Sequence, residues 1–124
     1  MAEAAHAQDT LAPDALANRI ADIAADKKAV DVRILDLRGI VGYTDFFVIA
    51  SGNTERQTKA IHDAIHEELK KEHRLLPRRV EGDREARWVL MDYLDVVVHI
   101  FTPEARGYYR LEQLWGEAPS RDVE

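Results

Sequence analysis

Two histidines spaced one helical turn apart are the first residues of the sequence whose types could do chemistry. His62 and His66 stand in the string HDAIH, which has the shape of the zinc-binding H-E-x-x-H pattern, and side chains four apart share one face of a helix. Asp63 stands where the general-base glutamate belongs and is one methylene shorter, and no obvious third ligand follows. We therefore interpret these histidines as part of the solvated side of a helix, and we predict no metal site.

Three aspartates offer a second chemistry, the binding of Mg²⁺ by carboxylates. Asp45, Asp92 and Asp95 flank apolar, strand-like runs, and nucleotidyltransferase-like enzymes combine such carboxylates with a Gly/Ser turn, for which Ser51–Asn53 would serve. Asp92 and Asp95, however, straddle a predicted hairpin turn instead of alternating along one strand. The turn at Ser51 also lacks the several glycines and the lysine of a phosphate loop. We favour a protein without catalytic residues or cofactors, and a Mg²⁺-dependent enzyme stays open as the alternative.

The hairpin of residues 88–101 carries the most informative pattern. A two-residue turn at Tyr93 and Leu94 would pair Trp88 with His99 and would sort the hairpin into two faces. One face is uniformly apolar and belongs in the core. The other mixes aromatic side chains with carboxylates and a histidine, which suits either an interface with an aromatic anchor or a face that a helix covers. The residues that we predict to contact a partner are Trp88, Leu90, Asp92, Tyr93, Asp95, His99 and Phe101.

The periodicity of the chain predicts the elements that position this hairpin. Helices are expected from Pro13 to about Lys28, from Asn53 or Thr54 to just before Pro77, and from Pro103 onward, and strands at residues 30–37, 45–52, 78–82, 86–93 and 95–102. This order (helix, strand, strand, helix, three strands, helix) indicates an α/β fold with a single mixed sheet of about five strands flanked by helices. We predict a flexible N-terminal tail at residues 1–12, one domain at 13–116 and a flexible C-terminal tail at 117–124.

Composition limits the classes of partner. The chain has 124 residues and a formal net charge of −6, which repels a nucleic-acid backbone and favours a basic protein partner. It contains no cysteine, so thiolate catalysis and disulfides are excluded. Its longest apolar run is far shorter than the roughly 20 residues of a membrane span. We expect a cytoplasmic protein that binds neither DNA nor a membrane.

Two long stretches resemble the ribosomal silencing factor family, also called the Iojap-like proteins. They are YTDFFVIASGNTERQTKAI at residues 43–61 and WVLMDYLDVVVHIFTPEARGYYRLEQLW at 88–115, and the similarity spans roughly residues 16–116. Within them stand the family's D-F-F-V-I-A-S-G strand, an R-Q pair opening a helix, a D-Y-x-D-V-V-V-H-I-F hairpin and a terminal Y-x-L-E-x-L-W. Leu94 departs from the family by standing where a small residue is usual, and Arg110 replaces a more usual Asp or Asn.

The resemblance implies a translational repressor without catalytic activity. Proteins of this family bind the large ribosomal subunit through its fourteenth ribosomal protein, uL14, and block joining of the small subunit when nutrients are scarce. The implied fold is a five-stranded mixed sheet related to nucleotidyltransferases, often as a homodimer. A dimeric adaptor for another partner is a further alternative. Trp115 is expected to pack the last helix onto the domain.

Overall fold

The structure is a computed structural model that describes residues 11–123. Its helices and strands follow the predicted order, with two additions near the C-terminal end. The last predicted helix is divided in two at Arg110, whose backbone is left-handed with a φ of 50°, and a sixth strand follows it. The elements are α2 (Pro13–Asp26), β1 (Val30–Asp36), β2 (Phe46–Ser51), α3 (Glu55–His73), β3 (Arg79–Glu81), β4 (Trp88–Asp92), β5 (Val96–Phe101), α4 (Pro103–Tyr109), α5 (Leu111–Leu114) and β6 (Ser120–Val123).

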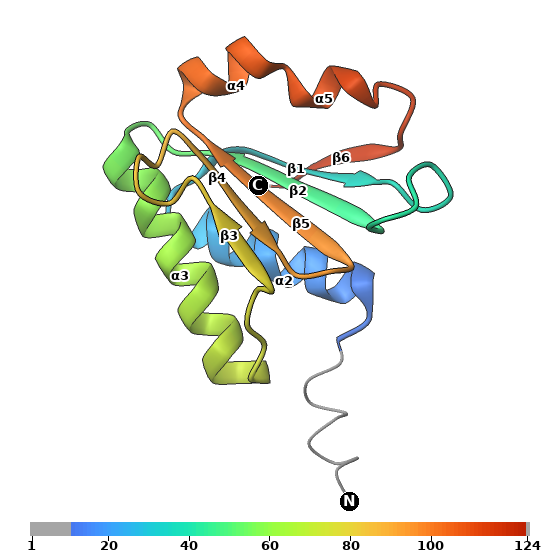
Figure 1. Ribbon diagram of the computed structural model, residues 1–124, viewed down its shortest axis with the longest axis horizontal. Coiled ribbons are helices and arrows are strands. Elements are labelled where there is room, and N and C mark those ends of the chain that lie inside the picture. The colour runs from blue at the N-terminus through green and yellow to red at the C-terminus, as the bar shows by residue number, and fades with distance from the viewer. Residues whose placement is uncertain (1–10, 124) are drawn as a thin grey trace, which may run out of the picture.

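One sheet of six strands, in the order β3-β4-β5-β2-β1-β6, forms the centre of the molecule (Figure 1). The central strands β2 and β5 run parallel, with Phe46 beside Val96 and Ser51 beside Phe101. All other neighbouring strands are antiparallel. A parallel pair needs a long crossover connection, and the chain between β2 and β5 supplies α3, β3 and β4 for it. The predicted α/β class with a single mixed sheet is confirmed.

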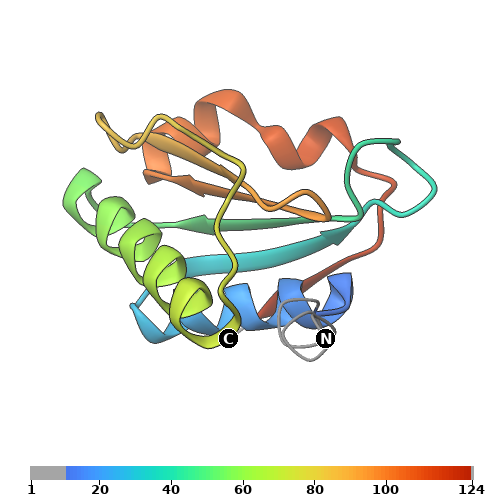
Figure 2. The same cartoon turned by 60° about the horizontal axis from the view of Figure 1, so that its bottom comes forward.

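Helices cover both faces of the sheet (Figure 2). α2 and α3 pack on one face, against a core that includes Val48 and Val98, and the segment with α4 and α5 packs on the other, against Phe47 and Ile49. Every residue of β2 and β5 is therefore buried, which explains why these strands are almost continuously apolar in the sequence. No helix within residues 11–123 is long and apolar enough to cross a membrane.

Thr54 begins α3 as its N-cap residue. Its Oγ1 accepts a hydrogen bond from the backbone N–H of Gln57 (3.1 Å), and Gln57 Oε1 accepts one from the backbone N–H of Asn53 (2.8 Å). This reciprocal arrangement resembles a capping box. Gln57 Nε2 also donates to the carbonyl oxygens of Lys27 and Lys28, at 3.2 and 2.9 Å, where α2 ends. One side chain thus stabilises the start of α3 and joins it to the end of α2.

The segment predicted as a C-terminal tail differs most from expectation. Residues 120–123 form β6, which pairs antiparallel with β1 and places Arg121 opposite Ile34. Because the sequence of β6 is mostly polar and its side chains stay largely exposed, hydrophobic periodicity could not reveal it; backbone pairing holds it at the edge of the sheet. In the predicted N-terminal tail, residues 1–10 lie outside the described part of the chain.

Candidate functional site

The turn between β4 and β5 is centred on Leu94 and Asp95, one residue later than the turn at Tyr93 and Leu94 that we predicted: Asp92 pairs with Val97, and the backbone N–H of Tyr93 donates to the carbonyl oxygen of Val96 (2.9 Å). Leu94 has a φ of 78° there, a backbone conformation that glycine adopts at lower cost than leucine. The displacement of the turn changes the register, so Trp88 lies opposite Phe101 and not opposite His99. The shift is two residues, and because side chains alternate with a period of two, the division of the paired strands into two faces is as predicted.

The face that we predicted to meet a partner is covered by α4 and α5 of the same chain. Its buried members are Asp92, His99 and Phe101, and its half-buried members are Trp88 and Leu90. The ring of Trp88 lies 4.5 Å from that of Tyr109 in α4. Tyr93 is also buried, but it packs in the core on the opposite side of the sheet. Of the two alternatives that the sequence left open, the structure shows the face that a helix covers, because Ala105 and Leu111 bury their apolar side chains there.

His99 is a neutral side chain inside this covered face. The indole Nε1–H of Trp88 donates a hydrogen bond to His99 Nδ1 (3.1 Å), so Nδ1 carries no proton. His99 Nε2 has no hydrogen-bond partner among the described residues. Burial beside the rings of Phe47 and Phe101, whose centroids lie 4.6 and 6.2 Å away, lowers the pKa of His99 to about 3. The role of His99 in this arrangement is packing.

The two aspartates of the hairpin have different surroundings. Asp92 is buried; its Oδ1 accepts a hydrogen bond from the backbone N–H of Leu94 (2.8 Å), and its Oδ2 accepts one from Arg78 (3.2 Å). Asp95 is exposed, and its carbonyl oxygen accepts a hydrogen bond from the backbone N–H of Asp45 (2.9 Å). Asp92 therefore stabilises the turn, and Asp95 joins the turn to the loop between β1 and β2.

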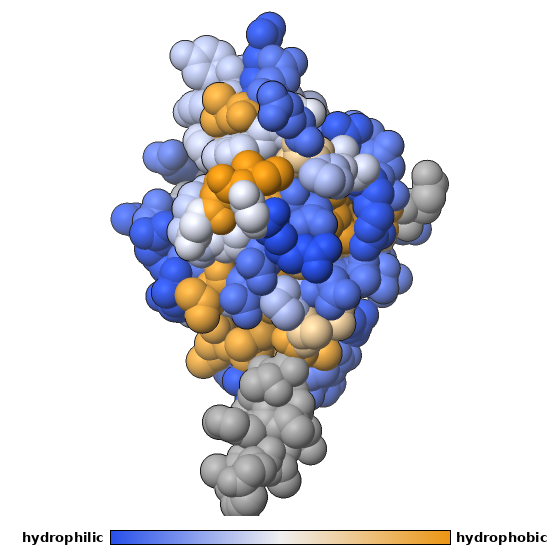
Figure 3. All heavy atoms as spheres, turned by 90° about the vertical axis from the view of Figure 1, so that its right-hand side faces the viewer, coloured by the Kyte–Doolittle hydropathy of each residue, from blue (hydrophilic) through white to orange (hydrophobic). Residues whose placement is uncertain are grey.

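Exposed apolar and acidic side chains lie where the β4–β5 turn meets the loop between β1 and β2. We call the side chains of Tyr43, Asp45, Leu94 and Asp95 the tip surface. Tyr43 and Leu94 are 56% and 49% exposed, Asp95 is exposed and Asp45 is half-buried. Figure 3 views the molecule from this side and shows hydrophobic surface interrupting the hydrophilic surface. Carboxylates beside exposed apolar side chains suit contact with a basic protein.

The residues considered for metal binding do not assemble into a metal site. Within residues 11–123, no group of three or more His, Cys, Asp or Glu side chains is arranged to hold a metal ion, which includes the three aspartates of the alternative Mg²⁺ site. The rings of His62 and His66 lie 6.0 Å apart, and His62 Nδ1 lies 2.9 Å from Asp63 Oδ1. The histidine pair therefore lacks a third ligand in this part of the chain.

Packing accounts for the Ser51–Asn53 turn. A Cβ at Gly52 would lie 2.7 Å from the backbone nitrogen of Thr58, so a larger residue would push β2 and α3 apart. Ser51 Oγ accepts a hydrogen bond from Arg106 (2.8 Å). The glycine thus permits a close strand-to-helix approach, and the serine attaches α4 to the end of β2.

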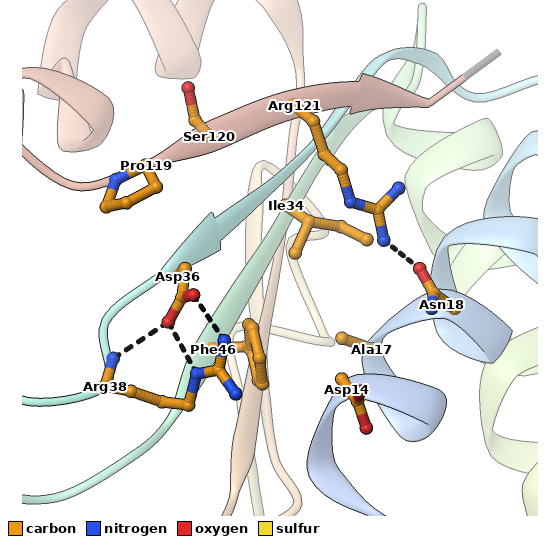
Figure 4. A pocket seen from close by; sticks show the side chains of 10 residues that line it. All are labelled: Asp14, Ala17, Asn18, Ile34, Asp36, Arg38, Phe46, Pro119, Ser120 and Arg121. Carbon is orange, nitrogen blue, oxygen red and sulfur yellow. Dashed lines mark hydrogen bonds and ion pairs between the residues drawn. The ribbon is translucent and has the colours of Figure 1, made fainter.

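A pocket of about 310 Å³ lies between α2 and the edge formed by β1 and β6 (Figure 4). On one side Arg38 forms a bidentate ion pair with Asp36 (2.9 and 2.7 Å), and its guanidinium lies 4.9 Å from the ring centroid of Phe46. On the other side Arg121 donates a hydrogen bond to Asn18. Both guanidinium groups are thus engaged within the chain. Sequence reasoning missed this pocket because one of its walls is β6, which was predicted to be a tail.

Comparison with known proteins identifies the family. The family model described as "Ribosomal silencing factor during starvation" matches residues 10–124. The chain belongs to the ribosomal silencing factor family. Ribosomal silencing factor RsfS of Bacillus subtilis is 44% identical to it over 99 residues, which are 80% of this chain and 83% of that protein. A crystal structure of a protein from Bacillus halodurans is 42% identical with a TM-score of 0.70, and the match covers 87% of this chain and 94% of that one. A crystal structure of a protein from Chromobacterium violaceum is 33% identical with a TM-score of 0.75, and the match covers 81% of this chain and 83% of that one.

The terminal Y-x-L-E-x-L-W motif of the ribosomal silencing factor family closes the covered face. Trp115 packs edge-on against Phe47, with ring centroids 5.2 Å apart, which confirms that it anchors the last helical segment. Glu112 of the motif accepts two hydrogen bonds from Arg106, each 3.0 Å long, and these hold the pKa of Glu112 below its usual range. The ion pair connects α4 with α5 across the break at Arg110.

Proposed function

We propose that this ribosomal silencing factor binds the large ribosomal subunit through its fourteenth ribosomal protein, uL14, and blocks joining of the small subunit. Membership of the family, whose model is named for silencing during starvation, supports a role on the ribosome. The formal net charge of −6 supports a basic protein as the direct partner. The mechanism is steric, needs neither a catalytic residue nor a cofactor, and operates in the cytoplasm.

Of the seven predicted contact residues only Asp95 is exposed, and it belongs to the tip surface. We therefore propose that its carboxylate, with that of Asp45, pairs with lysine or arginine of the partner. Leu94 and Tyr43 supply apolar contact beside them. Asp92 contributes indirectly, because its hydrogen bond to the Leu94 backbone N–H (2.8 Å) sets the shape of the turn. Trp88 and Phe101 pair at the end of the hairpin that lies away from the turn.

A stable interface is larger than the tip surface alone. Standard interfaces bury about 800 Å² per partner, roughly a ninth of the 7268 Å² that this chain exposes. Ile40 and Leu114, 48% and 68% exposed, line with Trp115 a hollow of about 520 Å³. Trp115 and Tyr43 both lie near the ring of Phe47, with centroids 5.2 and 6.4 Å away, so the hollow continues the tip surface. We propose that an apolar side chain of the partner fills it.

Co-sedimentation with purified large subunits tests the binding step. The wild-type protein is expected to migrate with large subunits and not with small ones. Asp95→Lys should weaken that binding at least tenfold, since it places a like charge against the basic partner, while Glu67→Lys, the same charge reversal at an exposed position on α3, should leave it within twofold. Equal binding by wild type and Asp95→Lys would show that the tip surface is not the contact.

Two other outcomes would support the alternative functions. Thermal stabilisation by a nucleotide with Mg²⁺ would indicate a nucleotidyltransferase-like enzyme, because a ligand that binds only the folded state raises the melting temperature. Self-association without ribosome binding would indicate a dimeric adaptor. A homodimer of the ribosomal silencing factor itself stays a prediction, and analytical ultracentrifugation of the free protein measures it.

A further inference from the structure

Three arginines line a third pocket, on the side of the sheet that carries α4 and α5. The pocket has a volume of about 340 Å³, and the charged side chains that line it are those of Arg33, Arg106, Arg110 and Glu112. With Asp122, whose Oδ1 lies 2.9 Å from Arg33 Nε, two carboxylates balance these three guanidinium groups, so one positive charge is left over in a chain whose formal net charge is −6. A local excess of positive charge on an acidic protein attracts an anion to that place in particular.

Two of these arginines are held in fixed positions and the third is available. Arg106 donates three hydrogen bonds, two to Glu112 (3.0 Å each) and one to Ser51 (2.8 Å), which leaves two of the five N–H donors of a guanidinium. Arg33 donates a hydrogen bond to Asp122 (2.9 Å) and lies 3.4 Å from the same carboxylate of Glu112. Arg110 is exposed, and its side chain has no hydrogen-bond or ion-pair partner within residues 11–123. The pocket therefore offers preorganised donors and one uncompensated cation.

Two tyrosines follow the pocket residues Arg106 and Gly107 in α4, and their rings are exposed to solvent. Tyr108 is 80% exposed and Tyr109 is 49% exposed, and their rings meet edge to face with centroids 5.0 Å apart. A tyrosine that is 80% exposed contributes little to the core. A cationic groove beside an aromatic platform is the arrangement that binds single-stranded nucleic acid, because phosphates pair with the cations while bases stack on the rings.

We propose that the segment Arg106–Arg110, with the sequence RGYYR, together with Arg33, binds single-stranded RNA. A phosphodiester occupies the arginine pocket, and the adjacent base stacks on Tyr108. Gly107 also lines the pocket and has no neighbouring atom within 4 Å of the position of a Cβ, so the nucleic-acid backbone can approach the helix closely. This inference rests on the proposed function only for the source of the RNA, an unpaired segment exposed on the large subunit.

The RNA-binding segment and the tip surface lie at opposite ends of β5. β5 begins at the turn that carries the tip surface and ends two residues before α4 (Figure 1). A partner protein bound at the tip surface therefore lies at the other end of β5 from the RGYYR segment, and one that also fills the hollow beside Trp115 reaches the edge of the arginine pocket, because Gln113 lines both. The RNA contact would raise the affinity of this protein for the large subunit, because two linked sites on one molecule bind the same subunit more tightly than either site alone.

Fluorescence anisotropy of a labelled ten-nucleotide oligouridine tests the proposal on the isolated full chain. Wild type should bind, and Arg110→Glu should weaken binding at least tenfold. Tyr108→Ala should weaken it about 5- to 150-fold, the range of one base–aromatic stack. Lys59→Glu changes the charge by the same amount at an exposed position on α3, and it should change binding less than twofold. Two phosphate contacts predict a slope near −1.4 for log affinity against log salt concentration.

The controls separate this site from general attraction of anions and from the proposed function. Arg110 and Tyr108 are exposed, so both variants should keep the wild-type circular dichroism spectrum and melting temperature. The proposal would be overturned if wild type did not bind RNA, or if Lys59→Glu and Arg110→Glu lost the same amount of RNA affinity. It would also be overturned if heparin bound as tightly as RNA and its binding did not depend on Tyr108. A protein that blocks subunit joining but does not bind RNA refutes this site alone; one that binds RNA but does not block joining refutes the proposed function alone.

Discussion

Acidification is expected to destabilise this protein through His99. The side chain is buried and neutral with a pKa of about 3, whereas in an unfolded chain a histidine titrates near 6.5. Below about pH 6.5 the unfolded state therefore binds more protons than the folded state, and stability falls with pH until about pH 3. At about 1.4 kcal/mol per pH unit, His99 costs about 2.5 kcal/mol between pH 7 and pH 4.5. That is a large part of the 5–15 kcal/mol by which domains are typically stable.

Urea denaturation of wild type and His99→Asn between pH 7 and pH 4.5 measures this cost. Asparagine keeps an acceptor for the Trp88 indole N–H and does not titrate. At pH 7 the variant should be less stable by about 1–3 kcal/mol, because it loses ring volume in a packed site. Carboxylates act equally in both proteins, so the gap between them should shrink by about 2.5 kcal/mol at pH 4.5. If the free energies of unfolding of the two proteins changed with pH in parallel, the neutral, buried state of His99 would be refuted. The control is the same substitution at another histidine, His66→Asn, at a half-buried position on α3.

Two further stability predictions follow from the C-terminal segment and from a strained glycine. Glu112→Gln removes the charge that faces Arg106. The free energy of unfolding should fall by about 1–3 kcal/mol after allowance for partial exposure, and the melting temperature by about 4–12 °C. An unchanged melting temperature would show that water solvates the two side chains as well as they solvate each other. Gly82→Ala adds a Cβ at a φ of 79° that would overlap the carbonyl oxygen of Trp88, and it should cost about 2–4 kcal/mol in urea denaturation. Gly107→Ala, with open space around it, should be neutral or stabilising by up to about 1 kcal/mol, so equal losses in both glycine variants would contradict the strain argument.

Elements with a strong local signal were predictable from the sequence. The near-continuous apolar run of residues 46–51 indicated a central strand covered on both faces, and β2 is buried along its whole length. Capping residues before an apolar stripe indicated α3, which begins after Thr54. In each case the residues within one element carry the information, because hydrophobic period and capping chemistry are properties of a short segment.

Features that depend on tertiary contacts were not predictable in the same way. The turn at Leu94 and Asp95 depends on the buried carboxylate of Asp92 and on a positive φ at Leu94, and leucine gives no signal for that conformation. β6 is mostly polar, so only its pairing with β1 defines it. The alternation of side chains predicted correctly which residues of the hairpin share a face of the sheet. Whether a helix covers that face depends on where α4 and α5 pack. For the same reason the acidic tip surface emerged only once the turn and the β1–β2 loop were seen together.

The measurement that tests the central claim most directly is subunit reassociation in the presence of this protein. Large and small subunits are mixed at a Mg²⁺ concentration that favours joining, and light scattering follows the formation of whole ribosomes. Wild type and Glu67→Lys are predicted to lower the amplitude in proportion to their occupancy of the large subunit, and Asp95→Lys to restore most of it. Joining that proceeds at full amplitude with saturating wild-type protein would contradict the account.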